Sequence, residues 1–391
     1  MRRLAIVLSH PVQYYSPWFR YLRAQTNVEF KVFYLWEFGV TPQHDQQFAT
    51  TFQWDVDLLS GYEYEFVPNI ARDPGTHHLR GLHNPTIGKR LAAWRPEAIL
   101  LFGYHGLTHL QVIGWARCHR VPLLFRGDSH LLGRKKLPVF TQQLLKIIYR
   151  QFAAVTFVGE ANQAYFQSLG VPPNRLFFTP HSVNADHFSP TDKTARDTAT
   201  GLRRALGLSA KRVMLFAGKF HERKQPVELL QAFLQVATNN DALIFVGDGP
   251  VKAQLHALAA TRPEICVCFL PFANQSEMPS RYLLADIFVL PSRGAYETWG
   301  LAINEAMHLG LPCLVSDVVG CQRDLVIPGK TGWVFPADNF SALAATLSTA
   351  LRTTPEEMQR FSQAATETMK GYTYQQTSAG LLEALASLPA D

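Results

Sequence analysis

Two glutamates, Glu297 and Glu305, stand eight positions apart around the start of an expected helix. The helix should begin near Gly300, after a buried strand and a turn, which leaves Glu297 in the loop and Glu305 on the first turns. Both carboxylates then face one cavity and accept hydrogen bonds from sugar hydroxyls, while N–H groups at the helix start attract phosphate. Taken alone, the pair is also typical of an ordinary acidic residue at a helix start followed by a surface residue. The flanking sequence is therefore needed to distinguish these two interpretations.

A basic loop precedes this segment in the chain. It lies between a strand expected to end at Ala217 and a helix expected to begin near Pro226, and it contains Gly218, Lys219, Arg223 and Lys224. Parallel α/β sheets bind ligands at the carboxyl ends of their strands, where cations are suited to holding a diphosphate. A turn with Gly249 follows the next expected strand. Without further context, such a loop is more typical of a solvated surface.

These loops are expected to connect buried strands to helices. The expected strands are short apolar runs with helix-like segments between them, and the runs form two series. In the first half the expected strands are 4–8, 30–35, 98–102, 122–125, 154–158 and 176–179. In the second half they are 213–217, 243–246, 266–270, 286–290, 312–315 and 333–335, followed by helices over 341–351, 355–369 and 375–388. The pattern predicts an α/β protein of two facing, Rossmann-like, doubly wound domains with a ligand cleft between them.

Polar composition without periodicity over 189–198 indicates the linker between the two series. We therefore expect one Rossmann-like domain over 1–188 and a second over 189–370. A last helix within 371–391 should pack back on the first domain.

Composition narrows the class of protein. The chain has 391 residues, of which 47% are hydrophobic and 17% charged, as expected for a globular protein of two domains. No apolar run is long enough for a transmembrane helix, and the run over 4–8 is too short for a signal peptide. Five cysteines without CxxC spacing indicate neither a disulfide framework nor a zinc site, which favours a cytoplasmic protein.

The positive charge is concentrated in the first half. Residues 1–190 hold 19 Lys and Arg against 12 Asp and Glu, a net +7, while the remainder holds 18 against 19, a net −1. This excess of positive charge is modest, and the sequence has no repeated pattern of basic and aromatic residues. Both observations argue against a nucleic-acid partner. A basic solvated face and an anionic partner or membrane surface both remain open.

The surroundings of the glutamate pair closely resemble the nucleotide-binding signature of retaining glycosyltransferases of family 4, also called glycosyl transferases group 1. The resemblance lies in Glu297-x7-Glu305 with the flanking segments 285–292 and 305–312. Three further segments are similar to elements of that family: 180–188, 215–224 and 330–335. The similarity is strong over the second half and loose over the first. It implies the GT-B fold and a nucleoside-diphosphate sugar as donor, with a nucleotide-sugar-binding domain over 189–370 and an acceptor-binding domain over 1–188.

The resemblance also implies roles for individual residues. Lys219 and Lys224, with Arg223 beside them, would hold the pyrophosphate, although family members usually carry Arg where this chain has Lys219. Glu305 would bind the ribose, and Glu297 would bind the donor sugar and stabilise positive charge at its anomeric carbon. The backbone N–H groups of Trp299, Gly300 and Leu301 would meet the phosphates, with Gly218 and Gly249 close to the nucleotide.

The first half departs from the family at two places. Paired glycines often follow the first strand in this family, whereas this chain has Ser9 to Tyr15, in which His10 and Gln13 can serve as side-chain donors. A cleft histidine usually follows the fourth strand, and the corresponding position here is Asp128. Either Asp128 or His105, after the preceding strand, is expected to line the cleft, while an aspartate paired with Arg126 is an equally ordinary structural feature.

Family resemblance implies retention of anomeric configuration, commonly written as a front-face displacement without a dedicated protein base. No cofactor is expected, and no metal, because no DxD-like pair ends a strand. The aromatic stretch 14–22 and the basic segment 133–138 fit either a membrane or glycolipid contact or, more simply, a core-facing helix and an exposed loop. The expected protein is cytoplasmic, with a peripheral position at the inner membrane face as one possibility.

We therefore predict a retaining glycosyltransferase that moves a hexose from a UDP- or GDP-sugar to a glycan, a glycolipid or a small hydroxylated acceptor. Two alternatives remain at this stage: a sugar-nucleotide 2-epimerase of the same fold, and a catalytically inactive partner that binds nucleotide sugars.

Overall fold

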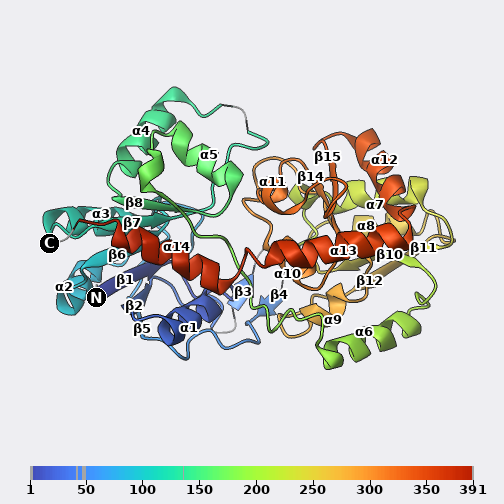
Figure 1. The fold of residues 1–391 in the computed structure, drawn as a ribbon, viewed down its shortest axis with the longest axis horizontal. Helices are drawn as coiled ribbons and strands as arrows, with labels where there is room; N and C mark the ends of the chain where they lie inside the picture. The colour runs from blue at the N-terminus through green and yellow to red at the C-terminus, as the bar shows by residue number, and fades with distance from the viewer. Residues whose placement is uncertain (1–2, 41–42, 46–49, 135, 390–391) are drawn as a thin grey trace.

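The computed structural model describes residues 3–40, 43–45, 50–134 and 136–389 and shows two lobes side by side (Figure 1). The remaining residues, which include Lys135 of the basic segment and the extreme ends of the predicted domains, lie outside the described part. Each lobe is built around one parallel sheet covered by helices. The two predicted α/β units are therefore present.

The first sheet has seven parallel strands. Their order is β5 (Tyr64–Phe66), β2 (Glu29–Tyr34), β1 (Arg3–Leu8), β6 (Ala98–Phe102), β7 (Leu123–Arg126), β8 (Ala154–Phe157) and β9 (Leu176–Phe178). The helices of this lobe are α1 (Tyr15–Gln25), α2 (Ile87–Trp94), α3 (Leu107–Cys118), α4 (Val139–Tyr149), α5 (Glu160–Ser168) and α14 (Tyr374–Ala386). A separate antiparallel pair, β3 (Gln43–Asp45) with β4 (Thr50–Phe52), follows β2.

The second sheet has six parallel strands. Their order is β12 (Cys266–Leu270), β11 (Asp241–Val246), β10 (Arg212–Ala217), β13 (Ile287–Leu290), β14 (Cys313–Ser316) and β15 (Gly332–Phe335). The helices of this lobe are α6 (Lys193–Ala205), α7 (Pro226–Val236), α8 (Lys252–Ala259), α9 (Met278–Tyr282), α10 (Leu301–His308), α11 (Gln322–Leu325), α12 (Phe340–Leu351) and α13 (Pro355–Met369).

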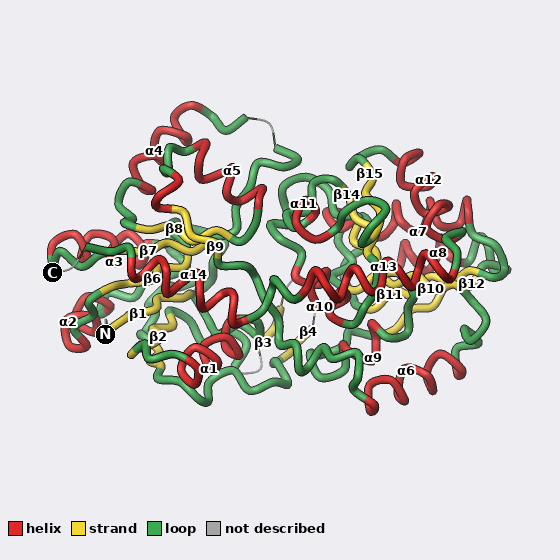
Figure 2. The backbone as a smooth tube through the Cα atoms, viewed as in Figure 1, coloured by secondary structure: helices red, strands yellow, loops and turns green. Residues whose placement is uncertain are grey.

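Strand β10 shows why both sheets are buried on two faces. Val213 and Leu215 belong to one hydrophobic cluster, whereas Met214 and Phe216 belong to the cluster on the other face. Successive side chains of a strand point to opposite faces, so a nearly continuous apolar run needs helices on both sides. Helices cover the two faces of each sheet, so the loops lie at the ends of the strands. In Figure 2 loops of both lobes lie between the two sheets.

The chain returns from the second lobe to the first through its last two helices. Helix α13 packs against α10 in the second lobe, and α14 packs against β9 and α1 in the first (Figure 1). Trp18 donates a 3.0 Å hydrogen bond to the Ser378 hydroxyl, and Gly380 lies so close to β9 that a Cβ atom would meet the Phe178 carbonyl oxygen at 1.8 Å.

The predicted linker is partly helical. Helix α6 begins at Lys193, with the Asp192 carboxylate accepting a 3.2 Å hydrogen bond from the Ala195 N–H. Its buried positions, Ala195 and Ala199, are small, so the usual apolar periodicity is absent from the sequence. The segment 189–198 thus includes the first turns of α6.

The aromatic stretch over 14–22 is a core helix. In α1 the side chains of Trp18, Phe19 and Leu22 are buried in the first lobe, so this stretch is not available to a membrane. Of the helices within the described residues, none combines the length and the apolar character that crossing a bilayer requires.

Candidate functional site

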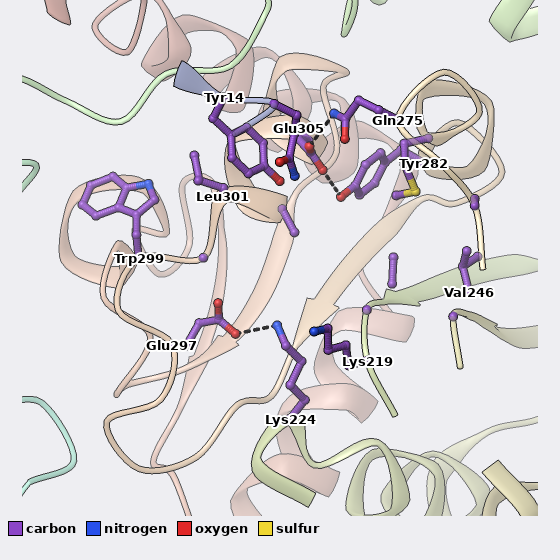
Figure 3. A pocket seen from close by; sticks show the side chains of 18 of the residues that line it. Tyr14, Lys219, Lys224, Val246, Gln275, Tyr282, Glu297, Trp299, Leu301 and Glu305 are labelled. Carbon is purple, nitrogen blue, oxygen red and sulfur yellow. Dashed lines mark hydrogen bonds and ion pairs between the residues drawn. The ribbon is translucent and has the colours of Figure 1, made fainter. Parts of the chain in front are cut away.

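A cavity of about 520 Å³ lies between the two lobes. The first lobe contributes Gln13, Tyr14, Trp54 and Asp128. The second lobe contributes the loops after β10, β11 and β13 and the start of α10, as seen in Figure 3. We call this space the donor cavity. Of the residues predicted from the sequence, it contains Gln13, Asp128, Gly218, Lys219, Lys224, Glu297, Trp299, Gly300, Leu301 and Glu305.

An ion pair joins the two loops of the second lobe. The Lys224 ammonium nitrogen lies 2.7 Å from Glu297 Oε2, and Figure 3 shows this contact with Lys219 beside it. Both side chains are largely buried, and the Ser292 hydroxyl donates a further 3.0 Å hydrogen bond to the same carboxylate oxygen. The pair places one positive and one negative charge in adjacent positions on the cavity wall.

Helix α10 begins at the cavity. Gly300 has φ +96°, and a Cβ atom there would lie 3.1 Å from both Leu290 and Val319, so this turn requires glycine. The N–H groups of the first helical turn have no intrahelical partner, and they carry the positive end of the helix dipole. Because Trp299, Gly300 and Leu301 line the cavity, the N–H groups of this helix start have the arrangement that can bind an anion.

Glu305 is held deep in the cavity wall. Its side chain accepts hydrogen bonds from Tyr282 at 2.6 Å and from Gln275 at 3.0 Å, and it also interacts with the Tyr14 hydroxyl. Burial raises the pKa of Glu305, and these hydrogen bonds offset part of the increase. These hydrogen bonds hold the carboxyl group in one orientation at the cavity wall.

Asp128 faces the second lobe from the loop after β7. Thr298 donates a 2.8 Å hydrogen bond to Asp128 Oδ2, and His181 Nε2 lies 3.5 Å from the same oxygen. Burial opposes ionisation of Asp128, but the interactions with His181 and Thr298 prevail and lower its pKa. Asp128 is not paired with Arg126, whose guanidinium group donates to Thr179 instead.

Four predicted site residues lie outside the donor cavity. His10 packs edge-on against the stacked rings of Trp36 and Phe38, and burial lowers its pKa to about 4. His105 is exposed and hydrogen-bonds the Thr76 carbonyl at 2.8 Å, so the structure brings Asp128 and not His105 to the cavity.

The other two are Gly249 and Arg223. Gly249 packs on the backbone of Phe220, where a Cβ atom would lie 2.6 Å from the carbonyl oxygen, whereas Gly247 lines the cavity. Arg223 points away from Lys224 to a neighbouring cavity and lies over the ring of Tyr296.

Several cavity residues were not predicted as site residues. Tyr14, Gln275 and Tyr282 surround Glu305. Outside the cavity lining, His130 of the first lobe donates from Nε2 to the Glu297 carbonyl oxygen at 3.1 Å, and this hydrogen bond joins the two lobes. His181 belongs to segment 180–188, whose resemblance to the interdomain segment of the family is the sequence feature that could have identified it.

One group among the described residues has the composition of a metal site: Asp73, His77 and His78. Both imidazoles hydrogen-bond Asp73 Oδ2, at 3.1 and 3.2 Å. The group lies on the surface, and none of its members lines the donor cavity. It therefore has no part in the chemistry considered for that cavity.

Residues 201–368 match the family Glycosyl transferases group 1. A GDP-mannose-dependent alpha-(1-6)-phosphatidylinositol monomannoside mannosyltransferase of Mycolicibacterium smegmatis is 28% identical over 231 residues, which are 57% of this chain and 59% of that relative. A D-inositol 3-phosphate glycosyltransferase of Rhodococcus erythropolis is 26% identical over 84% of this chain and 78% of its own length.

Among solved structures, an Anabaena protein, Alr3699/HepE, determined in complex with UDP, matches 99% of this chain and all of its own. The TM-score is 0.75 at 18% sequence identity, which establishes the common fold. The family match over residues 201–368 thus identifies the second lobe as a glycosyl transferases group 1 domain, and the shared architecture over the whole length shows that the chain has the GT-B fold.

Proposed function

We propose that the protein is a retaining hexosyltransferase that uses a UDP- or GDP-sugar and transfers the hexose to a hydroxyl group of a glycan, a glycolipid or a small polyol. The observation that carries this proposal is the Lys224–Glu297 pair beside the start of α10. A cation and a helix N-terminus suit the diphosphate, and the adjacent carboxylate suits the sugar. The Anabaena neighbour holds UDP, and the M. smegmatis relative is named for GDP-mannose.

The donor would lie across the cavity with its ribose at Glu305 and its hexose at Glu297. Lys219, Lys224 and the N–H groups of Trp299 to Leu301 then surround the diphosphate, where negative charge increases as the bond to the anomeric carbon breaks. Glu297 accepts hydrogen bonds from the hexose and stabilises positive charge at that carbon. Each contact becomes stronger as the bond breaks, so the site favours the transition state.

Retention fits a front-face displacement. The bond between the anomeric carbon and the phosphate oxygen breaks, the acceptor oxygen bonds to the same face, and its proton passes to the departing phosphate. Asp128 enters from the first lobe as a carboxylate, bound to Thr298, and serves to orient hydroxyl groups at the cleft. No step of this scheme requires a metal or a cofactor.

We further propose peripheral contact with an anionic membrane surface through α4. Four large apolar side chains of this helix are exposed, namely Val139, Phe140, Leu144 and Ile147. Exposed basic residues, Arg134, Lys136 and Arg150, lie at both ends of this apolar face. This combination of apolar anchors and flanking cations is typical of a helix that lies in the membrane interface. The free cysteines of the described chain fit a cytoplasmic setting.

Incubation with UDP-, GDP- and ADP-hexoses tests the main proposal. The expected result is saturable binding of one nucleotide sugar, with slow hydrolysis that retains the anomeric configuration. Release of a 2-epimer would instead establish an epimerase, and binding without hydrolysis or transfer would establish an inactive partner.

A further inference from the structure

A second cavity, of about 620 Å³, adjoins the donor cavity. Its wall contains the side chains of Arg134, Arg223 and Arg293, and Tyr296 lines both cavities. Tyr296 is the residue next to Glu297. We call this second space the arginine cavity, and it lies directly beside the position proposed for the transferred hexose.

Both lobes build the arginine cavity. Arg134 belongs to the loop between β7 and α4, while Arg223 and Arg293 belong to the loops after β10 and β13. The Arg293 N–H donates to the Arg223 carbonyl at 2.9 Å, which joins the two loops of the second lobe. Across the cleft, Gly133 approaches Gly294 so closely that a Cβ atom would lie 2.9 Å from its carbonyl oxygen. The three arginines therefore line one cavity at the place where the two lobes meet.

The cavity wall is strongly positive. Asp338 is the carboxylate in its lining, against three arginines. Arg293 also lies 3.9 Å from Glu222, whose side chain is 75% exposed and gives only weak compensation. The Arg223 guanidinium lies over the Tyr296 ring, 5.1 Å from its centroid. Stacking uses the face of the guanidinium and leaves its N–H edge available for hydrogen bonds to an anion.

We infer that the arginine cavity binds a phosphate or diphosphate group of the acceptor. This inference rests on the proposed transferase function. The donor diphosphate already has Lys219, Lys224 and the α10 start within its own cavity. The arginine cavity lies on the other side of Tyr296 from the donor cavity. An anion bound there would be separate from the donor diphosphate and would lie next to the position proposed for the hexose. Arginine forks bind phosphate oxygens in bidentate fashion, so the subsite selects acceptors whose reacting sugar or polyol carries phosphate close by.

Binding is tested with inorganic pyrophosphate as the probe, titrated calorimetrically into the protein saturated with the nucleotide diphosphate that binds best. The parent should bind pyrophosphate at a second site, and Arg134→Ala and Arg293→Ala should each weaken that binding about tenfold, as expected for loss of one charged hydrogen-bonding partner. Affinity for the nucleotide itself should not change. Arg360→Ala, on the exposed surface of α13, is the matched control.

Equal pyrophosphate affinity in the parent and in both cleft variants would overturn the inference. If no nucleotide binds the parent, the proposed function fails. In that case the pyrophosphate affinities of the parent and the two variants are compared without nucleotide, and this comparison still tests the arginine cavity. The two failures are thus distinguishable.

Transfer assays separate the two sources of phosphate. One arm uses a soluble sugar phosphate, a second uses a sugar linked through diphosphate to a short polyprenyl chain, and a third uses the matching methyl glycosides. We expect Arg134→Ala to raise KM for a phosphorylated acceptor about tenfold with little change in kcat, and to leave the methyl glycosides unaffected. Activity on the lipid-linked arm alone identifies a lipid phosphate, and activity on the soluble arm identifies a free one. An equal effect on phosphorylated and unphosphorylated acceptors would contradict the subsite.

Discussion

In the donor cavity the Lys224 ammonium nitrogen lies 2.7 Å from Glu297 Oε2, although the two residues are 73 positions apart in the chain. Ser292 holds the same carboxylate oxygen from a second direction. In the proposed function, this cation binds the phosphate and the adjacent carboxylate binds the sugar. The ion pair also means that loss of either side chain leaves the other without its partner, so each variant needs separate readouts for binding and turnover.

Glu297→Ala should abolish turnover while nucleotide binding stays nearly intact, because the proposed contacts of Glu297 are to the hexose. The expected loss in kcat is about 100-fold or more, the scale seen when one stabilising group is removed from an active site. Steady-state kinetics and calorimetry with the free nucleotide measure the two quantities. Glu264→Ala, at an exposed site, is the control, and unchanged turnover in Glu297→Ala would refute the assignment.

Lys224→Ala should weaken nucleoside-diphosphate binding about tenfold and leave nucleoside binding unchanged, because the charge acts on the phosphates. Calorimetry with a nucleoside diphosphate and with the matching nucleoside separates the two contributions. Lys252→Ala removes a lysine that pairs with Asp248 outside the donor cavity and should have no such effect. If diphosphate affinity is the same in Lys224→Ala and in the parent, Lys224 is not part of the phosphate site.

Much of the fold was predictable because its strands are short apolar runs that stand between polar loops. Strands β6 and β12 and helix α13 have the predicted bounds. The small strand β5 was missed because its Tyr-Glu-Phe sequence is only partly buried at a sheet edge.

The site was predictable where one local segment supplies it, as with Glu297, Gly300 and Glu305. Contacts that depend on tertiary approach were not: Tyr282 reaches Glu305 from α9, and His181 reaches Asp128 from another loop. Arg223 and Lys224 are neighbours in sequence, yet they point into different cavities, because the 3₁₀ turn over Glu222–Lys224 directs consecutive side chains apart. Neither the composition nor the spacing of this segment predicts that Arg223 and Lys224 line different cavities.

Stability should depend on pH through Asp324 at the contact between the lobes. This carboxylate accepts hydrogen bonds from the Glu160 N–H at 3.0 and 3.2 Å, and burial raises its pKa from 3.8 to about 6. The folded protein therefore binds this proton more tightly than the unfolded chain does. Its stabilising effect is complete below about pH 4 and is lost as pH rises through 6.

Asp324→Asn should lack this dependence. Relative to the variant, the parent should lose up to about 3 kcal/mol in free energy of unfolding between pH 4 and pH 7.5, since one pKa unit corresponds to about 1.4 kcal/mol. Urea denaturation at both pH values measures the difference. Asp197→Asn, an exposed site on α6, should follow the parent. A parent and an Asp324→Asn variant with parallel pH profiles would exclude this role.

Membrane contact through α4 predicts a loss of vesicle binding in a double variant, Phe140→Ser with Leu144→Ser. Both side chains are exposed, at 81% and 47%, so the fold should tolerate the change. Cosedimentation with vesicles that contain anionic lipid should weaken at least about tenfold, because two apolar anchors are removed. Leu382→Ser, on the exposed side of α14, is the control. Equal cosedimentation of the double variant and the parent would show that α4 is not the contact.

Proton NMR of the reaction with each nucleotide hexose, in the presence of candidate acceptors, tests the central claim most directly. The proposed function predicts release of the nucleoside diphosphate together with a hexose product whose anomeric configuration matches that of the donor, and loss of both signals in Glu297→Ala. An inverted product, a 2-epimer, or bound donor that is never consumed would contradict it.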